Sequence, residues 1–212
     1  MAGDEPQQGF RQVAERPRFD GHVFTVRTVV FADPDGHEFE RDVVRHPGAV
    51  SVVPSHGDGT VTLVRQFRAA VGTIVLEAPA GTCDVDGEDP ESTALRELEE
   101  EAGLSAGRVQ RLGAVYNSPG YTDQRTIVYL ASDVTPCATS PSGVEEQWMS
   151  TERIALEDVE RLVADGRLLD ATTIVGLLLA RRALESWTRR PPGPPGQGGK
   201  AGPPGQGWQP GP

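Results

Sequence analysis

The sequence predicts a mixed α/β fold, and three observations lead to this prediction. Residues 22–81 form short runs rich in Val, Thr and Phe that are separated by turn residues, which is typical of β-strands. A helix start at Asp89-Pro90-Glu91 follows these runs, and two more strand-like runs come after the helix. The last segments before the proline- and glycine-rich end of the chain are helical in pattern, and up to that point the chain has enough apolar residues to fold.

The N-terminal part predicts a flexible segment and then a β-hairpin. Residues 1–20 are polar, contain proline and show no period, so we expect them to be flexible. Residues 22–32 alternate like a strand, DPDG at 33–36 is a turn signal, and residues 37–46 are the predicted return strand. We define residues 21–47 as an N-terminal β region.

The next runs predict further strands. Residues 48–54 and 60–69 are apolar and flank the polar turn 55–59, so they are predicted to form a second hairpin. Residues 73–81 are predicted to form a short strand that ends at Gly81. The sequence therefore places a strand-rich region directly before the first helix.

The first helix is predicted from Pro90 to Ala102. Asp89 is a favourable N-cap, Pro90 suits the first helical position, and Gly103 suits the left-handed position that ends a helix. After it, residues 109–118 and 125–134 are predicted strands, residues 136–146 form a long loop, and segments 156–166 and 170–187 are predicted helices.

The chain ends in a segment with a different composition. Residues 189–212 consist mainly of proline and glycine, and glycine recurs at every third position from 193 to 205. Five such triplets are too few for a collagen triple helix, so we expect a disordered tail. The predicted domain therefore spans residues 21–188.

Composition excludes some partners. The net charge of −11 argues against binding to nucleic acid or to an anionic membrane surface. The N-terminus has no signal-peptide core, and the longest apolar run, residues 174–180, is too short to span a bilayer. Cys83 and Cys137 are too few for a disulfide scaffold, so we expect a cytoplasmic protein with reduced thiols.

The chemistry is concentrated on the predicted helix. Glu97, Glu100 and Glu101 are spaced by three and four residues and therefore share one helix face. Arg96 precedes Glu100 by four residues and can pair with it. An isolated acidic run is most often a solvated helix face, but carboxylates grouped in this way also suit Mg²⁺ or Mn²⁺, which prefer oxygen ligands.

The residues around these carboxylates resemble the Nudix family. Residues 96–104, RELEEEAGL, match the pattern R-E-U-x-E-E-x-G-U of the Nudix box, and Glu88 stands seven residues before Arg96 as the box requires. The box, residues 81–104, departs at its start, because six residues rather than five separate Gly81 from Glu88. EAPAG before the box, YNSPGYTDQ after it and VRQFR upstream resemble the ADP-ribose pyrophosphatase branch.

This resemblance implies a fold and a reaction. The fold would be an α/β/α Nudix sandwich with a mixed sheet, and the N-terminal β-hairpin region would build a homodimer. The reaction would be the hydrolysis of ADP-ribose, a nucleoside-diphosphate-linked substrate, to AMP and ribose 5-phosphate with Mg²⁺ or Mn²⁺. Such an ion also explains how so acidic a protein could hold an anionic substrate.

The resemblance also implies site residues. Glu97, Glu101 and the backbone carbonyl of Ala80 would bind metal, Glu100 matches the remaining metal-linked carboxylate, and Glu101 is also counted as catalytic. The general base would come from the loop at 142–148, where Glu145 matches the family best and Glu146 is the second candidate. For each of the two, a solvated loop carboxylate is the alternative.

Substrate contacts follow from the same resemblance. They fall on Arg68, Gln66, Arg41, Ser118 and Gln124. An arginine fork suits phosphate oxygens, although a surface arginine on an edge strand is the alternative for Arg68. Gln124 stands where the branch commonly has Glu near the terminal ribose, so it keeps an acceptor but loses the charge.

Two other functions compete with ADP-ribose hydrolysis. One is a Nudix pyrophosphatase for another nucleotide sugar or a dinucleotide, because the box reports phosphate chemistry and not the leaving group. The other is a non-catalytic Nudix sensor that binds ADP-ribose or controls transcription. The intact carboxylates and the acidic composition favour catalysis over that role.

Overall fold

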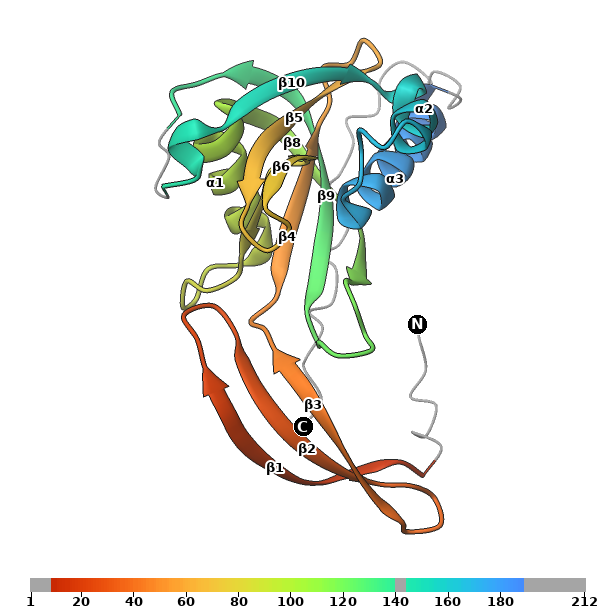
Figure 1. Ribbon diagram of the computed structural model, residues 1–212. Helices are drawn as coiled ribbons and strands as arrows, with labels where there is room; N and C mark the ends of the chain where they lie inside the picture. Colours follow the sequence, from red (N-terminus) through yellow and green to blue (C-terminus); the bar gives the residue numbers. More distant parts are fainter. Residues whose placement is uncertain (1–8, 140–143, 189–212) are drawn as a thin grey trace.

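The computed structural model describes residues 9–139 and 144–188, and it places them in a two-sheet body with an N-terminal sheet below it (Figure 1). The first eight residues and the predicted tail at 189–212 lie outside the described residues. Among the described residues, no helix is both long and apolar enough to cross a membrane.

The body contains two β-sheets. One has the order β7-β4-β9-β8 and the other the order β10-β5-β6. Strand β4 runs parallel to β9, whereas every other pair is antiparallel, so the sheet is mixed as predicted. The strand bounds are β4 Ala49–Pro54, β5 Thr60–Arg68, β6 Thr73–Glu77, β7 Ala80–Thr82, β8 Leu104–Tyr116, β9 Arg125–Pro136 and β10 Ser150–Ala155.

Helices cover the body on two sides. Helix α1 (Pro90–Ala102) lies on one side, and α2 (Val159–Ala164) and α3 (Ala171–Thr188) lie on the other (Figure 1). Leu98 of α1 packs with Val50 and Tyr129 in one apolar cluster, while Leu177 of α3 packs with Leu63 in a second cluster. The sheets therefore lie between two buried layers, which confirms the predicted α/β sandwich.

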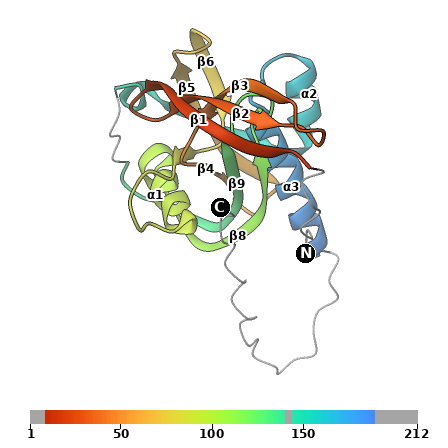
Figure 2. The ribbon, with the colours of Figure 1, turned by 90° about the horizontal axis from the view of Figure 1, so that it is seen from below.

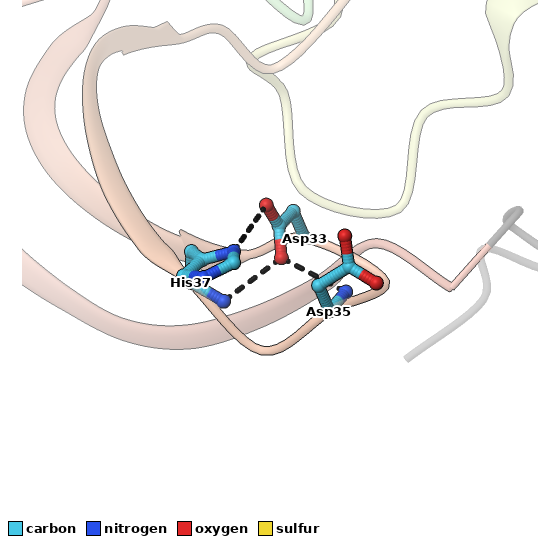
Figure 3. Close-up of side chains that lie close together, drawn as sticks. All are labelled: Asp33, Asp35 and His37. Carbon is cyan, nitrogen blue, oxygen red and sulfur yellow. Dashed lines mark hydrogen bonds and ion pairs between the residues drawn. The ribbon is translucent and has the colours of Figure 1, made fainter.

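The N-terminal sheet has the order β1-β2-β3 and projects from the body (Figures 1 and 2). Strands β2 (Thr25–Ala32) and β3 (Glu38–Arg45) form the hairpin that the sequence predicts. Asp33 holds the turn by accepting hydrogen bonds from the backbone of Asp35 and His37, at 2.9 and 2.8 Å, and it contacts the His37 ring (Figure 3). Asp33, Asp35 and His37 therefore lie close together because they form this turn.

The prediction for residues 1–20 differs from the structure. Residues 11–20 form strand β1 (Arg11–Asp20), which pairs with β2 from Arg11 opposite Ala32 to Asp20 opposite Thr25. All ten residues of the strand are exposed, so no apolar alternation marks it in the sequence. Its order comes from backbone hydrogen bonds to a neighbouring strand, which a local pattern does not reveal.

The predicted second hairpin is wrong. Strands β4 and β5 belong to different sheets and share one isolated bridge, Ser55 with Val61. Strand β5 pairs instead with β6 and with β10, a strand that the sequence did not predict. Most residues of β4 and β5 are buried, and a continuous apolar run does not specify the partner of a strand.

Helix α1 matches its prediction. The Asp89 side chain accepts hydrogen bonds from the backbone of Glu91 and Ser92, Pro90 starts the helix, and Gly103 ends it in the left-handed region with φ of 61°. The later helices are shorter or shifted: a 3₁₀ turn at Leu156–Asp158 precedes α2, and α3 starts one residue later than predicted.

Candidate active site

Helix α1 carries a group of carboxylates on one face. Glu97 and Glu101 are only 8% and 9% exposed, and Glu100 is half-buried. The same helix fixes their positions because Leu98 and Ala94 are fully buried in the core. The buried residues beside the carboxylates therefore anchor the helix to the core and fix the place of its acidic residues.

Arg96 connects several of these carboxylates. Its guanidinium donates hydrogen bonds to Glu97 at 2.7 Å, to Glu100 at 3.3 Å and to Glu88 at 3.1 Å. The predicted pair between Arg96 and Glu100 is thus present, and Arg96 also pairs with Glu88, the glutamate of the box that precedes the helix. One positive charge faces three negative ones, so the cluster remains strongly acidic.

This environment changes the acidity of two carboxyl groups. Burial raises the pKa of Glu97 to about 7, and Arg96 offsets only part of this effect. Burial raises the pKa of Glu101 to about 8. The hydrogen bond from the Ala80 amide and the nearby charge of Arg68 both lower this pKa, but they offset only part of the effect of burial. Buried carboxylates with so little compensation favour either protonation or a bound cation.

The backbone of strand β7 packs against the carboxylates of α1. The amide of Ala80 donates to Glu101 Oε2 at 2.9 Å. Gly81 lies so close to Glu97 that a Cβ at this position would overlap the carboxylate. The extra residue of the box falls in the loop between β7 and α1, and Gly81 still meets Glu97.

The donor set fits a hard divalent cation. Glu97, Glu100 and Glu101 offer carboxylate oxygens, and the backbone of Ala80 lies next to Glu101. Oxygen-only sites of this kind suit Mg²⁺ or Mn²⁺. A cation would also supply the positive charge that the raised pKa values of Glu97 and Glu101 show to be lacking.

Of the two predicted base residues, Glu146 lies near this face. It begins a 3₁₀ turn, Glu146–Trp148, and it is half-buried. Its charge contributes to raising the pKa of both Glu97 and Glu101. Glu145, the better match by sequence, is exposed.

Arg68 lies at the end of β5 and pairs with Glu77. Its Nε and Nη2 donate to Glu77 Oε2 at 2.9 and 2.6 Å, so Glu77 occupies one edge of the guanidinium and Nη1 lies outside this pair. The charge of Glu101 also acts on Arg68, which places Arg68 near the acidic face. Glu77 is a site neighbour that the sequence did not predict, and the only signal for it is its place in EAPAG.

Gln66 precedes Arg68 by two residues and therefore faces the same side of β5. Its side chain is 7% exposed, and its Oε1 accepts no hydrogen bond from the described residues. A buried acceptor without a donor is costly unless a ligand or water supplies one. The structure thus brings Gln66 and Arg68 together near the carboxylates.

Arg41 lies elsewhere, on the N-terminal sheet. Its guanidinium stacks over the Phe39 ring at 4.9 Å and lines an open pocket of about 330 Å³. The pocket lies between the hairpin and the loop after β8, and its walls include Phe31, Tyr116 and Tyr121. The predicted site is therefore divided between the acidic face of α1 and this pocket.

Ser118 and Gln124 are at the two ends of that loop. The carbonyl of Ser118 accepts hydrogen bonds from Tyr121 and Thr122 and closes a turn. The carbonyl of Gln124 accepts from Asn117, so the ends of the loop are joined. This arrangement places both predicted contact residues beside the pocket rather than on α1.

Comparisons with known proteins give consistent results. The model of the NUDIX domain family matches residues 45–169. The ADP-ribose pyrophosphatase of Bacillus subtilis (strain 168) is 33% identical over 178 residues, covering 83% of this chain and 96% of that protein. The ADP-ribose pyrophosphatase of Mycobacterium tuberculosis is 33% identical over 172 residues, covering 81% of this chain and 83% of that protein.

A solved structure described as an ADP compounds hydrolase supports the fold. It superimposes with a TM-score of 0.74 and 23% sequence identity, covering 86% of this chain and 98% of that one. At this identity the likeness shows the architecture alone. It agrees with the mixed sheet and the two helical layers described above.

Proposed function

The chain belongs to the NUDIX domain family, and from this premise we propose that it is a metal-dependent pyrophosphohydrolase that converts ADP-ribose and water to AMP and ribose 5-phosphate. The observation that carries the proposal is the pair of buried carboxylates, Glu97 and Glu101, set against the backbone of Ala80 and Gly81. The names of the two relatives that are 33% identical support the choice of ADP-ribose.

We assign the metal to α1 and β7. Glu97, Glu101, Glu100 and the carbonyl of Ala80 would hold Mg²⁺ or Mn²⁺. When bound, such an ion neutralises the diphosphate and lowers the pKa of a water molecule. Arg96 orients Glu97 and Glu100 through its hydrogen bonds and so keeps the carboxylates in position for the ion.

We assign the proton transfer to Glu146. As general base it would accept a proton from the attacking water while the water oxygen bonds to phosphorus and the diphosphate bridge breaks. Its position near Glu97 and Glu101 supports this choice over Glu145. Glu146→Gln should therefore lower kcat much more than Glu145→Gln, and the reverse order would assign the base to Glu145.

We assign substrate contacts to two groups of residues. Arg68 and Gln66 lie near the carboxylates, where a guanidinium fork and a free amide oxygen suit phosphate and hydroxyl groups. Arg41, Ser118 and Gln124 lie at or beside the pocket of about 330 Å³ and would hold the nucleoside or the terminal ribose. The neutral Gln124 would accept a ribose hydroxyl without adding charge.

We further propose that the enzyme is a cytoplasmic homodimer. The N-terminal sheet projects from the body, and apolar rings are exposed on it and beside it: Phe19 of β1 is 55% exposed, and Phe10, just before β1, is 46% exposed. An exposed strand with aromatic side chains suits pairing with a second copy. Light scattering after size exclusion tests the dimer, and the two free cysteines agree with a reducing compartment.

The direct test is hydrolysis of ADP-ribose with Mg²⁺, followed by separation of the products. Glu101→Gln should lose about 100-fold or more in rate, whereas Glu99→Gln, an exposed neighbour on α1, should keep it. A panel with other nucleotide sugars and dinucleotides tests the rival substrates. If the protein binds ADP-ribose but cleaves none of these compounds, the sensor function replaces the proposal.

A further inference from the structure

The segment between β6 and β7, Ala78 and Pro79, is held by hydrogen bonds to two different elements, β4 and α3. Ala78 and Pro79 are buried outside the strands, so their backbone groups need partners beyond a sheet ladder. The carbonyl of Pro79 accepts a hydrogen bond from the amide of Val52 on β4 at 2.9 Å. The amide of Ala78 donates to the hydroxyl of Thr173 on α3 at 2.9 Å.

Asp170 determines how Thr173 makes this contact. Thr173 is 1% exposed and lies in the first turn of α3. Its hydroxyl donates to Asp170 Oδ2 at 2.7 Å, and the same oxygen accepts from the Thr173 amide at 2.7 Å. Because the carboxylate takes the hydroxyl hydrogen, a lone pair of the hydroxyl oxygen is left for the Ala78 N–H.

This segment carries groups of the site at both ends. Glu77, on one side of Ala78, accepts hydrogen bonds from Nε and Nη2 of Arg68. Ala80, on the other side, donates its amide to Glu101. A shift of Ala78 would therefore move the partner of Arg68 and the backbone that faces Glu101 together.

We propose that Thr173, oriented by Asp170, is a positioning residue that sets the Glu77–Ala80 segment against the carboxylates of α1 and thereby determines the affinity of the site for a divalent cation. This inference rests on the proposed function in one respect, the placing of the cation on α1. Residues that orient the groups around a metal commonly change its affinity without binding it themselves.

The experiment measures Mn²⁺ binding by electron paramagnetic resonance of the free ion. Thr173→Val removes the acceptor with almost no change in shape and should weaken binding about tenfold, whereas Thr173→Ser should restore it to within about twofold of wild type. Thr62→Val is the matched control: Thr62 is 7% exposed, and its hydroxyl bonds His56 at 2.8 Å near the start of β5. It should lower thermal stability but keep Mn²⁺ affinity.

Two results would overturn the proposal. Either Thr173→Val binds Mn²⁺ as wild type does, or Thr62→Val weakens binding equally. If Thr173→Val does not fold, Thr173→Ala is measured with the same expected direction, and unchanged affinity there also overturns the proposal. Wild-type protein that binds Mn²⁺ but hydrolyses no nucleoside diphosphate would refute the proposed function, while the binding comparison would still decide the role of Thr173.

Discussion

Gly81 and the carboxylate of Glu97 occupy adjoining space so closely that even a methyl group at position 81 would overlap the glutamate. The overlap arises because β7 crosses the acidic face of α1 at this residue. Glu97 is 8% exposed and Arg96 also holds it, so its side chain has little room to move away. The glycine is therefore required by the site rather than by a turn.

Gly81→Ala should consequently reduce hydrolysis about 100-fold, because it displaces a proposed metal ligand. Gly113→Ala is the control, since a Cβ there would make an ordinary contact of 3.8 Å with Leu179. The measurements are kcat and Mn²⁺ affinity, together with the thermal midpoint to confirm folding. Equal activity of the two variants would contradict the role of Gly81.

The stability of the metal-free protein should fall as the pH rises from 5 to 8. In this window the folded state still holds protons on Glu97 and Glu101, whose pKa values are about 7 and about 8, while the unfolded state has already released them. The ionisation of Glu97 and Glu101 therefore lowers the free energy of unfolding by more than about 1 kcal/mol across this window. Carboxyl groups with a lowered pKa, such as Glu15, change the stability only at pH values below this window.

Urea unfolding at several pH values measures this slope. Saturating Mg²⁺ should raise the stability most at pH 8, because the ion needs deprotonated ligands. The double variant Glu97→Gln, Glu101→Gln should flatten the slope and lose the Mg²⁺ effect. A slope that persists in this variant would show that other groups cause it.

Arg68→Lys should raise KM about tenfold and change kcat less. Lysine keeps the charge, but it cannot hold Glu77 with two nitrogens and also offer a third nitrogen to substrate oxygens, as the guanidinium of Arg68 can in the proposal. Arg65→Lys, which changes an exposed arginine of the same strand, should leave both constants unchanged. If both variants behave alike, Arg68 has no special role in binding.

Arg45 and Asp123 should act on substrate binding as a unit. Arg45 donates to Asp123 at 3.2 Å and to Glu15 of β1 at 2.8 Å, and Asp123 also accepts the His46 amide at 2.9 Å. These bonds tie the loop that carries Ser118 and Gln124 to the N-terminal sheet. Asp123→Ala and Arg45→Met should each raise KM, and the double variant should raise it less than the two effects combined.

Local signals explain which parts of this protein could be predicted. Helix α1 has its N-cap at Asp89, its first residue at Pro90 and its C-cap at Gly103, and each acts through neighbouring residues. The carboxylate face follows from the helical period alone. The residues of the box therefore predict the helix and the carboxylates that lie together on it.

Local sequence signals could not predict contacts between segments that are far apart in the chain. The pairing of β4 with β9, the position of Glu146 near α1 and the bond between Ala78 and Thr173 all join residues far apart in the chain. Glu145 matches the family's loop better than Glu146 does, but a sequence match does not show which of two adjacent loop residues the backbone directs toward α1. The hydrogen-bonded strand β1 was missed because its side chains remain in water.

The parallel pairing of β4 with β9 sets an order of assembly during synthesis. The N-terminal sheet can form as soon as its three consecutive strands have left the ribosome, since each pairs with its neighbour in sequence. Strand β4 can pair early with β7, and β5 with β6, but β4 lacks β9 until residues 125–136 are made and β5 lacks β10 until later still. Non-local pairings of this kind slow folding and leave apolar strands open meanwhile. Nascent chains stopped before β9 should therefore be the ones that need chaperones.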